Sequence, residues 1–130
     1  MNSIKATLEI LGKTYDVLSY ETKFSYKTNK IGCISSPMQG GRIAIKFKST
    51  CDNVMPEAML KSELRRVDGK ISLMETKDNI VKREIEFKNA YIVHYKEVFG
   101  KHDEISLITL VTLSAQIISI RGIKFDKCWE

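Results

Sequence analysis

The stretch VKREIEFKNAYIVHY, residues 81–95, decides the class of fold because its apolar and polar side chains alternate. Val81, Ile85 and Phe87 are separated by charged neighbours, and the alternation resumes at Tyr91. Successive side chains of a β-strand point to opposite faces, so such a segment buries one face and wets the other. The stretch therefore predicts half-buried β-strands.

The same period of two recurs in LSYETKFSYK, residues 18–27, and in RIAIKFK, residues 42–48. In the first segment we expect Leu18, Tyr20, Phe24 and Tyr26 on the inner face. Ile43, Ile45 and Phe47 form the apolar face of the second segment. Half-buried strands are thus expected in most of the chain.

Turn residues separate the expected strands. Gly12-Lys13 predicts a tight hairpin between the first two strands, and Asp68-Gly69 predicts a turn before the strand at Ile71. We expect a bulge or a strand end near Glu97-Val98, where the alternation breaks.

One segment has helical spacing instead. Apolar residues between 52 and 67 recur at intervals of three and four, which predicts one amphipathic helix over about Asn53–Arg66. Pro56 is compatible with the first turn of such a helix.

Length, charge and cysteine count bound the class of protein. The chain has 130 residues and a net charge of +5, which fits one domain over residues 1–130. The N-terminal residues alternate and predict no signal peptide, and no apolar run is long enough for a membrane span. Three cysteines, Cys33, Cys51 and Cys128, leave at least one thiol unpaired, which favours reduced thiols and folding in the cytoplasm.

Two segments carry more apolar residues than a minimal β domain needs. The Gly/Ser-rich stretch 28–41 predicts an extended loop, yet it contains Ile31, Ile34 and Met38. These side chains either fold back onto the domain or dock on another subunit. The run 105–120 is apolar on both faces, so its second face requires cover from the helix or a neighbouring chain.

The residues that usually carry catalysis or bind metal do not cluster in the sequence. His94 and His102 have no partners at metal-ligand spacing, and there is no Cys-x-x-Cys motif. Gly40-Gly41 lacks the context of a phosphate-binding loop. In the segment Lys23–Lys27 the alternation puts lysines and rings on opposite faces, which disfavours nucleic-acid binding. We expect no enzyme, no catalytic residues, no cofactor and no metal site.

Five stretches occur in an order that resembles one known family, and they extend over about residues 4–129. They are IKATLEILGKTYDVLSYETKFSYKT, SSPMQGGRIAIKFKST, RRVDGKISL, REIEFKNAYIVHYKE and LVTLSAQIISIRGIKFDKCW. Their order resembles the tube protein of the type VI secretion system, the Hcp or TssD family, in the branch typical of Bacteroidetes. The resemblance implies a mainly β fold: a compact β-barrel of two packed antiparallel sheets with one α-helix.

The resemblance also implies a function. Subunits of this family close into homohexameric rings, and the rings stack into a tube that a contracting sheath propels behind a spike, with effectors as cargo. It implies a structural protein without a cofactor, assembled in the cytoplasm and secreted when the machine fires. The loop after the second strand then contacts another subunit or ring. The expected interface residues are Ile31, Ile34, Pro37, Met38, Ile108 and Leu110.

A second interpretation is a monomeric small β-barrel that binds a peptide or small ligand. Barrels of this size are usually filled with side chains, although some enclose a ligand. Mass in solution distinguishes the two interpretations, because a ring is a multiple of 14.9 kDa.

Overall fold

A computed structural model of the chain describes residues 4–50, 54–60, 66–77, 80–101 and 105–126. Seven strands and one helix occur in these ranges, which confirms the predicted mainly β class. They are β1 (Ile4–Ile10), β2 (Lys13–Thr22), β3 (Arg42–Lys48), α1 (Val54–Leu60), β4 (Val67–Glu75), β5 (Ile80–Lys101), β6 (Ile105–Ile120) and β7 (Ile123–Asp126).

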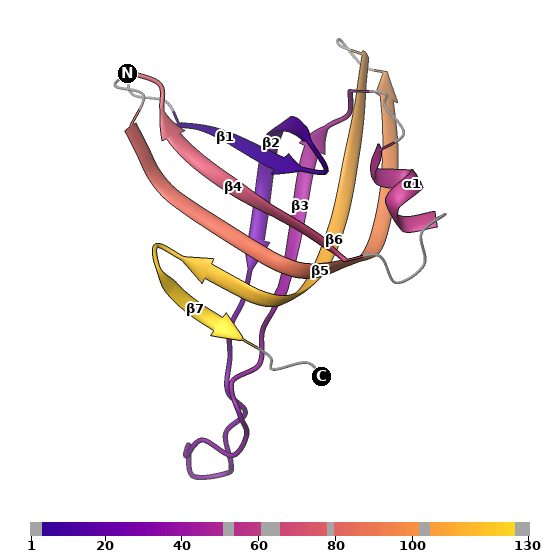
Figure 1. Cartoon of the computed structure of the whole chain (residues 1–130). Helices are drawn as coiled ribbons and strands as arrows, with labels where there is room; N and C mark the ends of the chain where they lie inside the picture. The colour runs from indigo at the N-terminus through magenta and orange to yellow at the C-terminus, as the bar shows by residue number, and fades with distance from the viewer. Residues whose placement is uncertain (1–3, 51–53, 61–65, 78–79, 102–104, 127–130) are drawn as a thin grey trace.

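The strands form a barrel in which all neighbouring strands are antiparallel (Figure 1). Their order is β3-β2-β1-β4-β5-β6-β7, and a further pairing of β3 with β6 closes the first six strands into a ring. β7 pairs with β6 outside this closed set. Closure removes most exposed strand edges, which would otherwise invite aggregation.

The two longest strands belong to two layers at once. β5 pairs with β4 only as far as Ala90, whereas it pairs with β6 along nearly its whole length. β6 pairs with β3 over residues 108–114 and with β7 over residues 117–120. One layer therefore contains β1, β4, β7 and the first part of β5, and the other contains β2, β3 and the second part of β5. Figure 1 shows the two layers crossing, which confirms the predicted pair of packed sheets.

Asn89 marks the corner at which β5 passes between the layers. Its backbone is left-handed, with φ 53°, a conformation that asparagine tolerates better than most residues. Its N–H donates to Asp68 Oδ1 at 2.8 Å, and its Nδ2 donates to Gln116 Oε1 on β6 at 3.1 Å. β5 changes its buried side here, since Phe87 and Ala90 are both buried although they are three residues apart, and β6 does the same between the buried Ala115 and Ile118.

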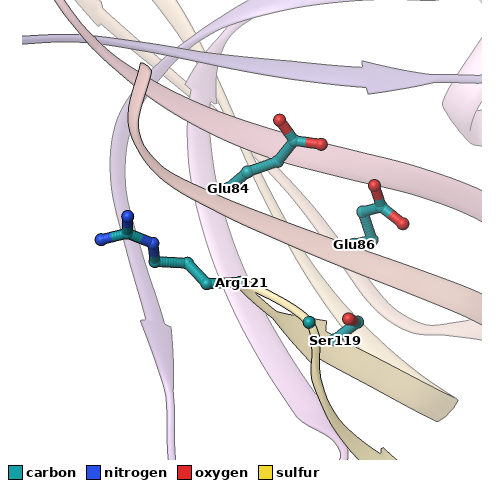
Figure 2. A pocket seen from close by; sticks show the side chains of 5 residues that line it. Glu84, Glu86, Ser119 and Arg121 are labelled. Carbon is teal, nitrogen blue, oxygen red and sulfur yellow. The ribbon is translucent and has the colours of Figure 1, made fainter. Parts of the chain in front are cut away.

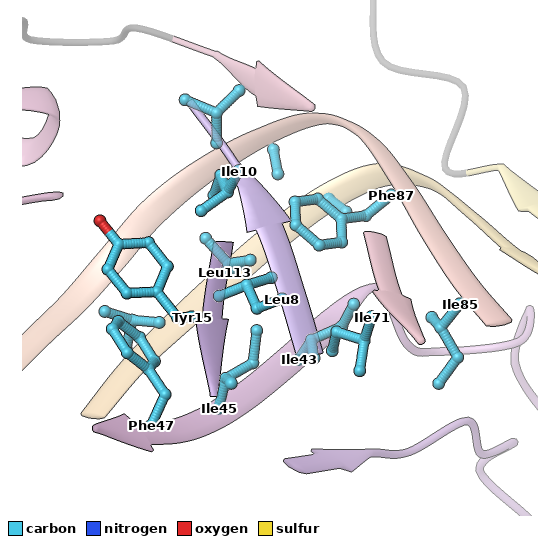
Figure 3. Packing of buried hydrophobic residues seen from close by; sticks show 14 of the residues in the cluster. Leu8, Ile10, Tyr15, Ile43, Ile45, Phe47, Ile71, Ile85, Phe87 and Leu113 are labelled. Carbon is cyan, nitrogen blue, oxygen red and sulfur yellow. The ribbon is translucent and has the colours of Figure 1, made fainter. Parts of the chain in front are cut away.

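The core lies between the layers, and its largest side chains alternate along the strands as predicted (Figure 3). Ile43, Ile45 and Phe47 of β3 are each no more than 2% exposed. Full burial of such a side chain contributes roughly 1.5–3 kcal/mol. The cluster also includes Leu8, Ile10, Tyr15, Ile71, Ile85, Phe87, Val111, Leu113 and Ile118.

The helix is present where predicted, and its buried side closes one end of the barrel. Met55 and Ala58 are buried, and Met55 lies beside Tyr15 and Phe47. Pro56 stands in the first turn, where its missing N–H costs no helical hydrogen bond. Of the predicted span Asn53–Arg66, Arg66 lies outside the helix, and Asn53 and 61–65 are outside the described residues.

Two predicted turns differ from the structure. The β1–β2 turn is Leu11-Gly12 and not Gly12-Lys13, and both residues have positive φ, as two-residue hairpin turns of the primed type require. Asp68-Gly69 lies inside β4 at an irregularity in its pairing. A Cβ at Gly69 would lie 2.5 Å from the Glu9 carbonyl oxygen, so this glycine permits close approach and does not make a turn.

The expected break near Glu97-Val98 is also wrong. β5 continues to Lys101, and its change of register against β6 falls between Ile92 and His94. The extra residue, Val93, lets Ile92 and Tyr95 both pack against the core.

Candidate subunit interface

The segment between β2 and β3, residues 23–41, extends from the barrel as an irregular hairpin (Figure 1). Two isolated antiparallel bridges join its arms, Ser25 to Gln39 and Thr28 to Ile34. The strand predicted through Lys27 therefore ends at Thr22. We call residues 23–41 the hairpin.

Local hydrogen bonds hold the tip of the hairpin. Asn29 Oδ1 accepts from the N–H groups of Ile31 at 3.1 Å and Cys33 at 3.0 Å. Asn29 N–H donates to the Cys33 carbonyl at 2.8 Å. Such asparagine side chains stabilise turns by replacing backbone partners, so the tip keeps its shape without a core of its own.

An aromatic contact fixes the base of the hairpin to the barrel. The rings of Phe24 and Phe125, on β7, meet edge to face at 5.0 Å between centroids. Gly40 lies against the same ring: a Cβ there would be 2.5 Å from Phe24 Cδ1. Phe24 is thus partly buried, as predicted, but it packs at the mouth of the hairpin and not along a continuous strand.

The apolar side chains of the hairpin face water in the isolated chain. Ile31 is 85% exposed and Ile34 63%, and Pro37 and Met38 are exposed as well. The interpretation that they fold back onto the core is therefore wrong. Leu18 and Tyr26, predicted inward, are also exposed, because Leu18 falls at a bulge in the β2–β3 pairing and Tyr26 lies beyond the strand.

A second exposed apolar group lies at the other end of the molecule. β5 and β6 end there as a two-stranded arm, opposite the hairpin (Figure 1). Val98 is 42% exposed and Phe99 64%. The sequence did not reveal this group, because the alternation breaks near Glu97-Val98, where we expected a bulge or a strand end.

The layer that contains β3 and the start of β6 has two strand edges without a partner strand. Residues 18–22 of β2 pair with β3, but the pairing of β2 with β1 covers only residues 13–17. Residues 91–101 of β5 pair with β6, and α1 lies beside them without pairing. Within the described chain, both edges therefore offer backbone N–H and C=O groups to another strand.

The remaining predicted interface residues lie on neither edge. Ile108 and Leu110 are half-buried on the outer face of β6. Leu110 pairs with Lys46 on one side and Lys96 on the other, so its side chain emerges between two lysines. The structure does not bring these two residues near the hairpin.

A surface depression of about 480 Å³ lies elsewhere, beside the β6–β7 turn. Glu84, Glu86, Ser119 and Arg121 line it, and the Arg121 side chain extends away from the two carboxylates (Figure 2). Three or more potential metal ligands do not cluster anywhere in the described part of the chain. His94 and the Cys33 thiol are exposed, whereas His102, Cys51 and Cys128 are outside the described residues.

Comparisons with known proteins agree with this architecture. A family model described as "Hemolysin coregulated protein Hcp (TssD)" matches residues 2–130. The structure of Hcp1 from Flavobacterium johnsoniae is 32% identical, with a TM-score of 0.88 and coverage of 95% of this chain and 99% of that one. No curated protein sequence matches the chain.

More distant structures share the fold. Hcp1 from E. coli is 11% identical with a TM-score of 0.71, covering 97% of this chain and 98% of that chain. A protein from the sheath/tube terminator of an extracellular contractile injection system is 13% identical with a TM-score of 0.62, covering 90% and 93%. Within the described residues, no helix has the length and apolar character needed to cross a bilayer. The match across residues 2–130 and the identity to a Flavobacterium relative make this chain a member of the Hcp (TssD) family of type VI secretion tube proteins.

Proposed function

We propose that copies of this chain close into six-membered rings and that the rings stack into the inner tube of a type VI secretion system. The number six comes from the family. The observation that carries the proposal is the layer with one open edge on β2 and another on β5. Each subunit thus presents two different edges, which is what a head-to-tail ring requires.

Edge-to-edge pairing is the lateral contact. Residues 18–22 of one copy add to residues 91–101 of the next copy, so that the backbone groups of both edges gain partners. Each net hydrogen bond contributes only about 0.5–1.5 kcal/mol, but the contact repeats around a closed ring. The irregular pairing at Leu18 leaves one residue of this edge outside the ladder with β3.

The hairpin supplies the axial contact. The hairpin, whose Ile31 and Ile34 are exposed, lies at one end of the subunit, and the end of β5, whose Val98 and Phe99 are exposed, lies at the other end (Figure 1). In a head-to-tail stack of rings, the hairpin of one subunit approaches the end of β5 in a subunit of the next ring. Burial of both groups removes apolar surface from water, which favours stacking by about 25 cal/mol per Å². Pro37 and Met38 belong to the same proposed contact.

The structure offers little support for a ligand-binding barrel. The barrel interior is occupied by the side chains of the core, and the space beside Tyr15, Phe47 and Met55 measures about 10 Å³. That is about the volume needed for one water molecule. The proposed partners are therefore other copies of the chain and, from the family, the sheath, the spike and effector cargo, with assembly in the cytoplasm before secretion.

Solution mass tests the ring. We expect a particle of several times 14.9 kDa, and we expect Leu18→Pro to abolish it while the barrel stays folded. Proline removes the N–H and is tolerated at edges and bulges. Leu18→Ala keeps the N–H and is the matched control.

Mass photometry and circular dichroism together read the result. Loss of the ring with Leu18→Pro and its retention with Leu18→Ala support pairing through this edge. A parent chain that remains monomeric at high concentration contradicts the proposal, and so does a Leu18→Pro variant that still forms the full ring.

A further inference from the structure

The excess of positive over negative charge in the chain comes from one segment. Residues 22–51 contain six cationic residues and no aspartate or glutamate. The whole chain has 21 cationic and 16 acidic residues, so 21 − 6 leaves 15 cations against 16 acids elsewhere. The net charge of +5 therefore comes entirely from the hairpin, β3 and the residues next to them.

The fold gathers part of this charge on one surface. Arg42, Lys46 and Lys48 alternate with the buried Ile43, Ile45 and Phe47, so all three cations project from the outer face of β3. Lys96 of β5 lies on the same face, since Lys46 and Lys96 both pair with Leu110 of β6. We call these four cations, with Ile108 and Leu110 between them, the basic face.

Among the residues that the structure describes, the cations of the basic face have no acidic partner within ion-pair distance. The ion pairs between described residues involve none of these four cations and are Lys5–Asp16, Lys70–Glu9 and Lys82–Glu75. Of the acidic side chains, Glu21 of β2 borders the face opposite Ala44. Like charges this close together cost free energy that an acidic partner would recover.

The centre of the basic face is apolar. Ile108 pairs across the sheet with Lys48 and Val98, and Leu110 lies between Lys46 and Lys96. A shallow depression of about 260 Å³ runs beside Leu110, with Ala44 and Thr112 in its lining. Apolar side chains encircled by cations suit an acidic protein surface better than a nucleic acid, whose binding sites add aromatic rings for base stacking.

Ring geometry determines where this face points. It is the outer face of the layer whose two edges, on β2 and β5, make the proposed lateral contact. A ring closed through those edges carries this layer around its axis, with the rest of each barrel packed on the opposite side. The bulkier side needs the larger circumference, so the basic face turns toward the axis.

We propose that the basic face binds an acidic protein partner and that, in the assembled ring, this face lines the channel and selects negatively charged cargo. The location in a channel rests on the proposed ring, whereas the preference for acidic protein rests on the face alone. A second copy of the chain is a poor occupant, because its remaining residues sum to a charge of only −1 and three of its acidic side chains are already paired. Ile108 and Leu110 then contact cargo and not a neighbouring subunit.

The test measures binding of a fluorescein-labelled poly-L-glutamate chain to the purified protein by fluorescence anisotropy. The Lys46→Glu/Lys96→Glu variant reverses two charges of the basic face. The matched control, Lys88→Glu/Lys124→Glu, reverses two exposed lysines of the other layer. We expect at least about tenfold weaker binding for the first variant and less than about twofold for the control, with all binding weakened by added salt.

Equal losses in the two variants overturn the proposal, because they indicate attraction to net charge alone. Tighter binding of an oligo-dT chain of equal charge also overturns it in favour of nucleic acid. If the glutamate variant does not fold, Lys46→Gln/Lys96→Gln replaces it with the same criterion. Mass photometry on every sample separates the two proposals: a monomer that binds through the basic face contradicts the ring alone, and a ring that does not bind poly-L-glutamate contradicts the acidic partner alone.

Discussion

The barrel interior and the hairpin use the same kind of side chain in opposite ways. Ile45 of β3 is 2% exposed, whereas Ile31 of the hairpin is 85% exposed. Both segments contain two isoleucines, and they are contiguous in the sequence, because the hairpin ends where β3 begins. The comparison teaches that apolar side chains of this chain stabilise the fold in one region and, in the proposed assembly, the contact between subunits in the other.

Hydrogen bonding makes this division possible. β3 is paired on both sides, with β2 and β6, and its inner side chains meet the opposite layer. The hairpin has two isolated bridges and a tip held by Asn29, so its backbone is ordered without a second layer to cover it. The backbone that carries Ile31 and Ile34 is therefore held by its own hydrogen bonds, although these two side chains are exposed.

The largest effect on folding is expected in the core. Ile45→Ala should lower the free energy of unfolding by about 2–5 kcal/mol, since it leaves a cavity among close-packed neighbours. Ile31→Ala is the control and should change it by no more than about 0.5 kcal/mol. Urea denaturation followed by circular dichroism measures both. Similar losses at the two positions would remove the distinction between the regions.

An intermediate effect is expected where the two regions join. Gly40→Ala puts a Cβ 2.5 Å from Phe24 Cδ1 and 3.1 Å from the Lys23 carbonyl oxygen. The Phe24 ring must then leave Phe125, and overpacking of this kind costs about 1–3 kcal/mol. The double variant Gly40→Ala/Phe24→Ala serves as the control.

Urea denaturation also measures the free energy of unfolding of these variants. The double variant should lose much less stability relative to Phe24→Ala than Gly40→Ala loses relative to the parent, because the clash with the ring is then absent and only the tight contact with the Lys23 carbonyl oxygen remains. A Gly40→Ala chain as stable as the parent would show that Phe24 does not anchor the hairpin.

The smallest effect on folding is expected at the exposed tip, together with a clear effect on assembly. Ile34→Asp should change the free energy of unfolding by no more than about 0.5 kcal/mol. It should raise the concentration needed for stacking by about tenfold or more, because a charge then enters an apolar contact. Negative-stain images and mass measurements detect the stacks. An unfolded Ile34→Asp chain would assign the hairpin to the fold itself.

The sequence was most informative where one period repeated without interruption. Ile43, Ile45 and Phe47 alternate strictly, and all three are buried. The resemblance over nearly the whole chain predicted the barrel and its helix, which the structure confirms. It also predicted the extended loop, whose arms the structure places at residues 23–41.

Irregularities in the strands were not visible in the pattern. The period of two ran on through Phe24 and Tyr26, although the strand ends at Thr22, because alternation does not distinguish a strand from an extended hairpin arm. Gly69 was predicted to be a turn residue. Glycine is required there because β1 and the Phe87 ring approach its backbone closely, and these contacts are distant in sequence. The open edges of β2 and β5 exist because β1 and β4 stop pairing with them partway. The ends of these pairings cannot be read from the sequence of one segment alone.

The corner at Asn89 has a consequence for the shape of any filament built from this chain. Hydrogen bonds to Asp68 and Gln116 fix the bend of β5, and with it the angle between the open edge of β5 and the layer that carries β7. β7 in turn touches the hairpin base through Phe125. In the proposed tube we therefore expect this corner to set the orientation of neighbouring subunits, and a substitution at Asn89 to change that orientation.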